Sequence, residues 1–161
     1  MPTTIPVPTS DALIQMLSGL VSAPVDVTRT TVDDPERDAR GIFAEYVTDA
    51  DELSALAFAD HRAVNFIGGA LVGVDAETLL EASNKAVFAE AADEGFQEVV
   101  NILASCLNSE FTKHVRLAKV LELPGQLDDD VKELWRRPGG RQAFRIAVED
   151  HGTGTLILYF R

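Results

Sequence analysis

The sequence passes from a strand pattern to a helix pattern within one stretch, Leu53-Ser-Ala-Leu-Ala-Phe-Ala-Asp-His-Arg-Ala-Val-Asn-Phe-Ile-Gly-Gly-Ala-Leu-Val-Gly73. Its first part is small and apolar, which is typical of a buried strand. Asp60 ends this strand and can cap the next element, in which apolar residues recur at helical spacing. Gly68 and Gly69 lie inside that helix and cost it about 1 kcal/mol each. Either these glycines allow close packing against a neighbouring element or the helix loosens there.

Further strands and helices are predicted on both sides of this stretch. Strand patterns lie at residues 25–30, 41–47, 52–59, 114–123, 143–149 and 155–160. Helices are predicted after a cap at Ser10, at residues 76–82, at about residues 84–111 after a cap at Ser83, and after Asp128. The last two strands are expected to form a hairpin across residues 150–154, whose glycines suit a turn. Consecutive strands with long helices elsewhere predict an α+β fold, an antiparallel sheet packed with long helices, in a single domain of residues 1–161.

The chain is acidic, with 26 Asp and Glu residues against 14 Lys and Arg residues and a formal net charge of −12. Nucleic acid and anionic membranes need a basic footprint, so neither is expected as a partner. The start of the chain lacks the pattern of a signal peptide, and no uncharged apolar run reaches the roughly 20 residues of a membrane span. A cytoplasmic location is therefore expected.

The cysteine and the histidines of this chain give no sign of a disulfide or a zinc site. Cys106 is the single cysteine, so it has no internal disulfide partner and is expected to be a buried core thiol. His61, His114 and His151 have no metal-ligand spacing, so no zinc site is expected. The basic run at residues 136–141 is interpreted as a solvated loop, with a contact for an acidic partner as the alternative.

The long helix predicted at residues 84–111 has two different faces. At about 100° per residue, one arc is apolar and the other is polar. The apolar arc consists of Phe88, Phe96, Val99, Leu103, Cys106 and Leu107, and the polar arc of Glu94, Gln97, Glu98, Asn101, Ser105 and Asn108.

Glu98 and Asn101 are the candidate site residues on the polar arc. On a helix, residues at this spacing share one face. A carboxylate and an amide presented together on a rigid helix can bind a partner and orient a water molecule. Without further context, such a pair is usually ordinary solvated surface.

The stretch Leu53–Gly73, followed by a long helix that carries Glu98-Val-Val-Asn101, resembles the CheC/CheX/FliY phosphatases. The helix-first start, the strand after the long helix and the C-terminal hairpin are also similar, so the resemblance covers nearly the whole chain. The Glu-x-x-Asn motif is weak alone and fairly specific in this context. CheX carries one such motif and CheC carries two. The first helix here has none, so the resemblance is to the single-site, CheX-like members.

This resemblance implies hydrolysis of the aspartyl phosphate on a CheY-like response-regulator receiver domain. Asn101 would orient the attacking water, and Glu98 would pair with the receiver's lysine. The receiver would supply Mg²⁺, so the phosphatase needs no cofactor of its own. The neighbouring polar residues Glu94, Gln97, Ser105 and Asn108 are then expected to contact the partner.

One position departs from the family pattern. The family commonly has glycine one turn beyond the asparagine, where this chain has Ser105. The added bulk is expected to weaken docking, to select a different receiver or to abolish activity.

Two alternatives to catalysis stay open. One is a non-catalytic signalling or scaffold domain that binds a receiver or a flagellar-switch partner through the same helix face. The other is a structural dimer module. CheX-like proteins pair through sheet edges, so a homodimer is expected, with the strand at residues 155–160 as a candidate edge.

Overall fold

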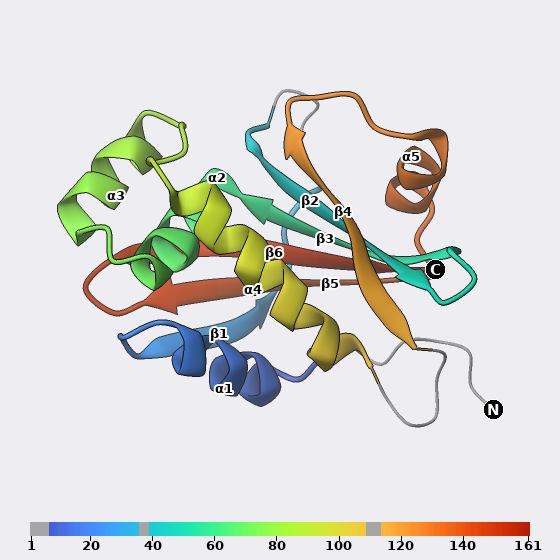
Figure 1. Cartoon of the computed structure of the whole chain (residues 1–161), viewed down its shortest axis with the longest axis horizontal. Coiled ribbons are helices and arrows are strands. Elements are labelled where there is room, and N and C mark those ends of the chain that lie inside the picture. The colour runs from blue at the N-terminus through green and yellow to red at the C-terminus, as the bar shows by residue number, and fades with distance from the viewer. Residues whose placement is uncertain (1–6, 36–38, 109–113) are drawn as a thin grey trace.

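Six antiparallel strands form one sheet in the order β1-β5-β6-β3-β2-β4, as seen in Figure 1. The computed structural model describes residues 7–35, 39–108 and 114–161. The strands are β1 (Val25–Thr30), β2 (Gly41–Thr48), β3 (Leu53–Asp60), β4 (Val115–Leu123), β5 (Gly140–Val148) and β6 (Gly152–Phe160). The helices are α1 (Ser10–Leu20), α2 (His61–Ala63), the π-helix η1 (Val64–Gly69), α3 (Ala76–Asn84), α4 (Ala92–Leu107) and α5 (Asp129–Arg136). The predicted α+β class and the antiparallel sheet are confirmed.

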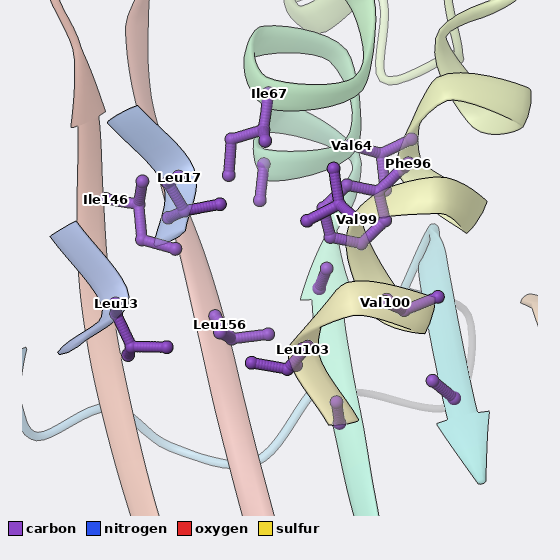
Figure 2. Close-up of a cluster of buried hydrophobic side chains, with 14 of the residues drawn as sticks. Leu13, Leu17, Val64, Ile67, Phe96, Val99, Val100, Leu103, Ile146 and Leu156 are labelled. Carbon is purple, nitrogen blue, oxygen red and sulfur yellow. The ribbon is translucent and has the colours of Figure 1, made fainter. Parts of the chain in front are cut away.

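The sheet separates two hydrophobic cores. Helices α1, α4 and the continuous α2–η1 segment cover one face and enclose the larger core, part of which Figure 2 shows. Its labelled members are Leu13, Leu17, Val64, Ile67, Phe96, Val99, Val100, Leu103, Ile146 and Leu156. The short helix α5 packs on the opposite face over a smaller core, in which Phe43 contacts Phe58, Trp135 and Tyr159. The two buried faces explain why β2 is buried at every position and does not alternate.

The last strand does not lie at an edge of the sheet. β6 pairs with β3 on one side and with β5 on the other, so the edge strands are β1 and β4. The prediction of residues 155–160 as an exposed edge was therefore wrong. Local sequence could not reveal this, because strand order depends on pairings between residues that are distant in the chain.

The glycines near the last hairpin do not form its turn. The turn consists of residues 149–151, and Val148 already pairs with Gly152. Gly152 and Gly154 lie within β6, where a Cβ atom would overlap the ring of Phe66 or the backbone of Ala63. These glycines let the α2–η1 segment approach the sheet closely, which is a tertiary requirement rather than a turn requirement.

Two helix starts also differ from the prediction. The side chain of Thr9, not of Ser10, caps α1 and accepts a hydrogen bond from the Ala12 amide at 3.0 Å. α4 begins at Ala92 rather than near residue 84, and Ser83 is a buried residue of α3 rather than a cap. The predicted end of the long helix at residues 109–111 lies outside the described residues. The cap predicted at Asp60 is confirmed, because its side chain accepts from the Ala63 amide at 2.8 Å.

A buried asparagine explains the late start of α4. Asn65 is fully buried in η1, and its amide group donates to Ser83 Oγ at 3.1 Å and to the Val87 carbonyl at 2.9 Å. Its oxygen accepts from the Ala89 amide at 2.8 Å. These bonds hold the segment between α3 and α4 in a non-helical path, which includes Ala91 at a φ of 67°. Tertiary hydrogen bonds thus override the helical pattern of this segment.

Both expectations for the paired glycines are fulfilled at once. The helix widens into π geometry over Val64–Gly69. A Cβ atom at Gly68 would overlap the Ala92 carbonyl, and one at Gly95 would overlap the Gly68 carbonyl. η1 and α4 therefore touch backbone to backbone through Gly68 and Gly95.

Replacing Gly68 with alanine should destabilise the protein strongly. The new methyl group has to push α4 away, which we expect to lower the unfolding free energy by about 3 kcal/mol. Denaturant unfolding followed by circular dichroism measures this change. The matched control is Gly19→Ala in α1, where nothing lies within 4 Å of the added atom. The control should raise stability by up to about 1 kcal/mol through helix propensity. Equal effects of both changes would contradict the close contact.

A buried carboxylate lies in β2. Glu45 is only 6% exposed, and its Oε2 atom has no hydrogen-bond partner among the described residues. Burial raises the pKa of Glu45 above its ordinary value, the Lys119 ammonium lowers it, and the Asp128 and Asp130 carboxylates raise it. The net direction is upward, so the fold favours the protonated form of Glu45.

The raised pKa of Glu45 predicts a specific pH dependence. Between the unfolded pKa and the higher folded pKa, the folded state binds more protons than the unfolded state, so the unfolding free energy falls as pH rises. Glu45→Gln removes this titration. The stability of the variant relative to the unmodified protein should therefore increase from pH 4 to pH 7 in chemical denaturation. Glu52→Gln, at an exposed position, serves as control. Parallel pH curves for Glu45→Gln and the unmodified protein would refute this role.

Candidate functional site

α4 carries the candidate site on the side that faces away from the sheet. Its buried side consists of Ala92, Gly95, Phe96, Val99, Val100, Leu103 and Leu107. Between these positions, Glu94, Gln97, Glu98, Asn101 and Ser105 are all exposed. The helix therefore has one anchored face and one free polar face.

Glu98 and Asn101 lie together on this exposed face. Their spacing places them about one helical turn apart, with both side chains on the same side of the helix. Neither side chain forms a hydrogen bond or ion pair with another residue in the described part of the chain. Both groups are thus available to a second molecule, and their hydrogen-bonding capacity faces solvent.

Asn108 does not belong to this exposed set. Its amide nitrogen donates to the carbonyls of Ala104 at 2.9 Å and Val115 at 3.0 Å, and its oxygen accepts from the Val115 amide at 2.8 Å. Asn108 therefore ties the end of α4 to the start of β4. The side chain of Asn108 thus forms its hydrogen bonds within the protein, whereas the side chain of Asn101 is exposed.

Ser105 is exposed but turns its hydroxyl back onto the helix. The Oγ atom donates to the Ile102 carbonyl at 2.8 Å.

Cys106, the neighbour of Ser105, is half-buried rather than fully buried, with its sulfur 3.8 Å from Met16 Sδ. Burial raises the pKa of the Cys106 thiol, so the thiolate is disfavoured. The prediction of a buried core thiol is thus only partly correct: Cys106 packs against the core but stays half-buried, because it lies at the border of the helix's buried face.

A tyrosine in the sheet holds α4 at the level of the candidate site. Tyr46 is fully buried, and its hydroxyl donates to the Val100 carbonyl at 2.6 Å. Val100 directly precedes Asn101. Burial raises the pKa of Tyr46, so the hydroxyl stays protonated and keeps donating. This bond adds a directional contact between α4 and the sheet to the apolar packing around it.

The sheet is irregular at the same place. The register of β2 changes next to Tyr46 against both neighbours, which leaves Ser54 as an extra residue in β3 and Ala118 as an extra residue in β4. Such bulges bend a strand and re-aim its side chains. Sequence reasoning missed Tyr46; the available signal was a tyrosine on the inward side of a buried strand, whose hydroxyl has to find a partner.

Tyr46→Phe should destabilise the protein while preserving its fold. Loss of one buried hydrogen bond predicts a decrease of about 1 kcal/mol in the unfolding free energy. Denaturant unfolding measures it. Tyr159→Phe is the matched control, because the Tyr159 hydroxyl donates at 2.8 Å to Asp34, which is largely exposed. The unfolding free energy should decrease less in this control variant than in Tyr46→Phe. An unchanged unfolding free energy in Tyr46→Phe would show that the Tyr46 bond carries little of the anchoring.

The exposed face of α4 is acidic. The helix contains Asp93, Glu94 and Glu98 and no lysine or arginine. The two acidic residues of the first turn suit the positive end of the helix dipole. A partner that docks on this face would be favoured by basic groups at the contact.

No group of three or more metal-ligating side chains comes together within residues 7–35, 39–108 and 114–161. Nor does any helix in these ranges have both the length and the apolar character needed to cross a membrane.

Comparison with known proteins shows the fold class. No protein-family model and no curated protein matches the sequence. Solved structures do match: the chain has the fold shared by CheX, FliY and the FliM middle domain.

Three of these structures illustrate the likeness. A chain of the complex of CheX with CheY, BeF3 and Mg²⁺ from Borrelia burgdorferi aligns with a TM-score of 0.57 and 8% identity, over 94% of each chain. A chain of the FliM–SpeE complex from H. pylori aligns with a TM-score of 0.66 and 8% identity, over 94% of this chain and 80% of that one. FliY from Thermotoga maritima aligns with a TM-score of 0.54 and 13% identity, over 91% and 81%. At these identities the likeness establishes the fold but not the chemistry of the site.

Proposed function

We propose that this protein hydrolyses the aspartyl phosphate of a response-regulator receiver domain. The observation that carries the proposal is the exposure of Glu98 and Asn101 side by side on α4, without partners in the described part of the chain. The helix beneath them is anchored by the Gly68–Gly95 contact and by the Tyr46 hydrogen bond. A rigid, outward-facing amide is what insertion into another protein's site requires.

In this proposal the two side chains have separate roles. The Asn101 amide holds a water molecule in line with the phosphorus atom. The water attacks phosphorus, the bond between phosphorus and the aspartyl oxygen breaks, and inorganic phosphate leaves the restored carboxylate. An amide suits this role because it donates and accepts hydrogen bonds without titrating. Glu98 pairs with a lysine of the receiver, and Mg²⁺ on the receiver offsets the phosphoryl charge. The rate enhancement comes from positioning, as phosphoryl transfer requires.

The remaining exposed residues of α4 complete the docking surface. Glu94 lies one turn before Glu98, Gln97 lies one turn before Asn101, and Ser105 lies one turn after Asn101. Because the Ser105 hydroxyl bonds to the Ile102 carbonyl, it adds bulk to this surface without offering its proton to the partner. The similar fold in the CheX–CheY complex supports a receiver as partner.

A second function is favoured by other neighbours of the same fold. FliM chains with this fold were crystallised with SpeE and with FliG, which is consistent with a binding or scaffold role. In that case the α4 face would bind a signalling or flagellar partner without hydrolysis. A homodimer and a cytoplasmic location also belong to the proposal. The strand edges available for pairing are those of β1 and β4.

Asn101→Ala should abolish accelerated dephosphorylation. A panel of CheY-like receivers is phosphorylated with a small phosphodonor and Mg²⁺, and phosphate release is followed with and without the protein. Loss of the positioned water predicts a decrease of at least about 100-fold in the catalysed rate. Asn84→Ala, a change of an exposed asparagine at the end of α3, is the matched control and should leave the rate unchanged.

Binding separates the two candidate functions. Affinity for the receiver with BeF3 and Mg²⁺ should persist in Asn101→Ala and fall in Glu98→Ala, which loses the docking carboxylate. Unchanged hydrolysis by Asn101→Ala would refute the catalytic role. Binding without hydrolysis by the unmodified protein would establish the scaffold function instead.

A further inference from the structure

A second surface feature lies on the opposite face of the sheet from α4. It is a cavity of about 430 Å³ beside α5, and we call it the α5 groove. Its lining includes Asp34, Leu123, Gln126, Lys132, Trp135 and Arg136. The volume falls at the small end of the range for ligand pockets. The proposed phosphatase function uses none of these residues.

The floor of the α5 groove is apolar and rigid. The ring of Trp135 packs edge-on against Phe43, with 5.2 Å between the ring centroids, and is half-buried. Leu123 next to it is buried in the smaller core. An aromatic ring held in this way offers a fixed apolar surface to an incoming side chain.

The rim of the α5 groove is positively charged. Lys132 and Arg136 lie one helical turn apart on α5, and neither forms an ion pair with another described residue. The acid among the named lining residues, Asp34, is already compensated: it accepts from Arg141 Nε at 2.9 Å and from the Tyr159 hydroxyl at 2.8 Å. The groove thus presents two available cations on a chain whose net charge is −12.

We propose that the α5 groove binds an acidic peptide segment of a partner protein, with one large apolar side chain on Trp135 and carboxylates at Lys132 and Arg136. The apolar floor and the cationic rim together match such a segment in chemistry. The groove is open to solvent along the exposed residues Gly125, Gln126 and Arg136, so a chain can enter and leave it. Because α4 lies across the sheet, this contact leaves Glu98 and Asn101 free, and the protein can hold two partners at once.

Trp135 allows a direct test, since it is the single tryptophan of the chain. The probe is the peptide acetyl-Asp-Glu-Phe-Asp-Glu-Leu-Asp-amide, which contains no tryptophan. Its titration into the protein of residues 1–161 should change the Trp135 fluorescence saturably. The double variant Lys132→Glu/Arg136→Glu should weaken binding about tenfold, from the loss of two solvent-accessible charge contacts. The matched control is Arg29→Glu/Arg145→Glu, which makes the same charge change at exposed positions outside the groove and should bind as the unmodified protein does.

Three outcomes would overturn the proposal. The first is no fluorescence change with the acidic probe. The second is equal weakening in the groove variant and the control variant, which would show that peptide binding depends only on the overall charge of the protein. The third is an equal response to free glutarate or inorganic phosphate at the same concentration, which would show a site for small anions only. Fluorescence does not depend on phosphate release, so failure here leaves the proposed phosphatase function unaffected.

Discussion

The close contact between η1 and α4 is the constraint on which the rest of the structure depends. Two carbonyl groups occupy the space that side chains would need at Gly68 and Gly95, so the two helices meet at their backbones. This approach brings α4 down onto the sheet, where the Val100 carbonyl meets the Tyr46 hydroxyl. The exposed face that carries Asn101 is set by these two contacts. A surface residue is thereby given a fixed place by groups that never reach the surface.

Local patterns predicted the framework of the fold well. The strands at residues 25–30 and 41–47 match β1 and β2 closely, and the short helix at residues 76–82 lies within α3. Such elements are determined by alternation, apolar spacing and nearby caps, which are properties of neighbouring residues. The exposed placement of Glu98 and Asn101 follows from the helical period in the same way.

The errors share a physical cause. Asn65 bonds to a segment about twenty residues away and keeps it from becoming helix, and β6 enters the middle of the sheet through pairings with distant strands. Gly154 allows α2 to approach β6 closely and does not form the turn of its own hairpin. Each of these features depends on groups that only the completed fold brings together. The anchoring by Tyr46 was missed for the same reason.

The backbone contact at Gly68 and Gly95 also bears on how such a protein can evolve. Each position faces the other's helix, so a larger residue at one cannot be offset by trimming a side chain at the other, because neither has one. The polar surface of α4 is under no such restriction. Side chains on that surface can therefore change without disturbing the contact between η1 and α4 that positions them.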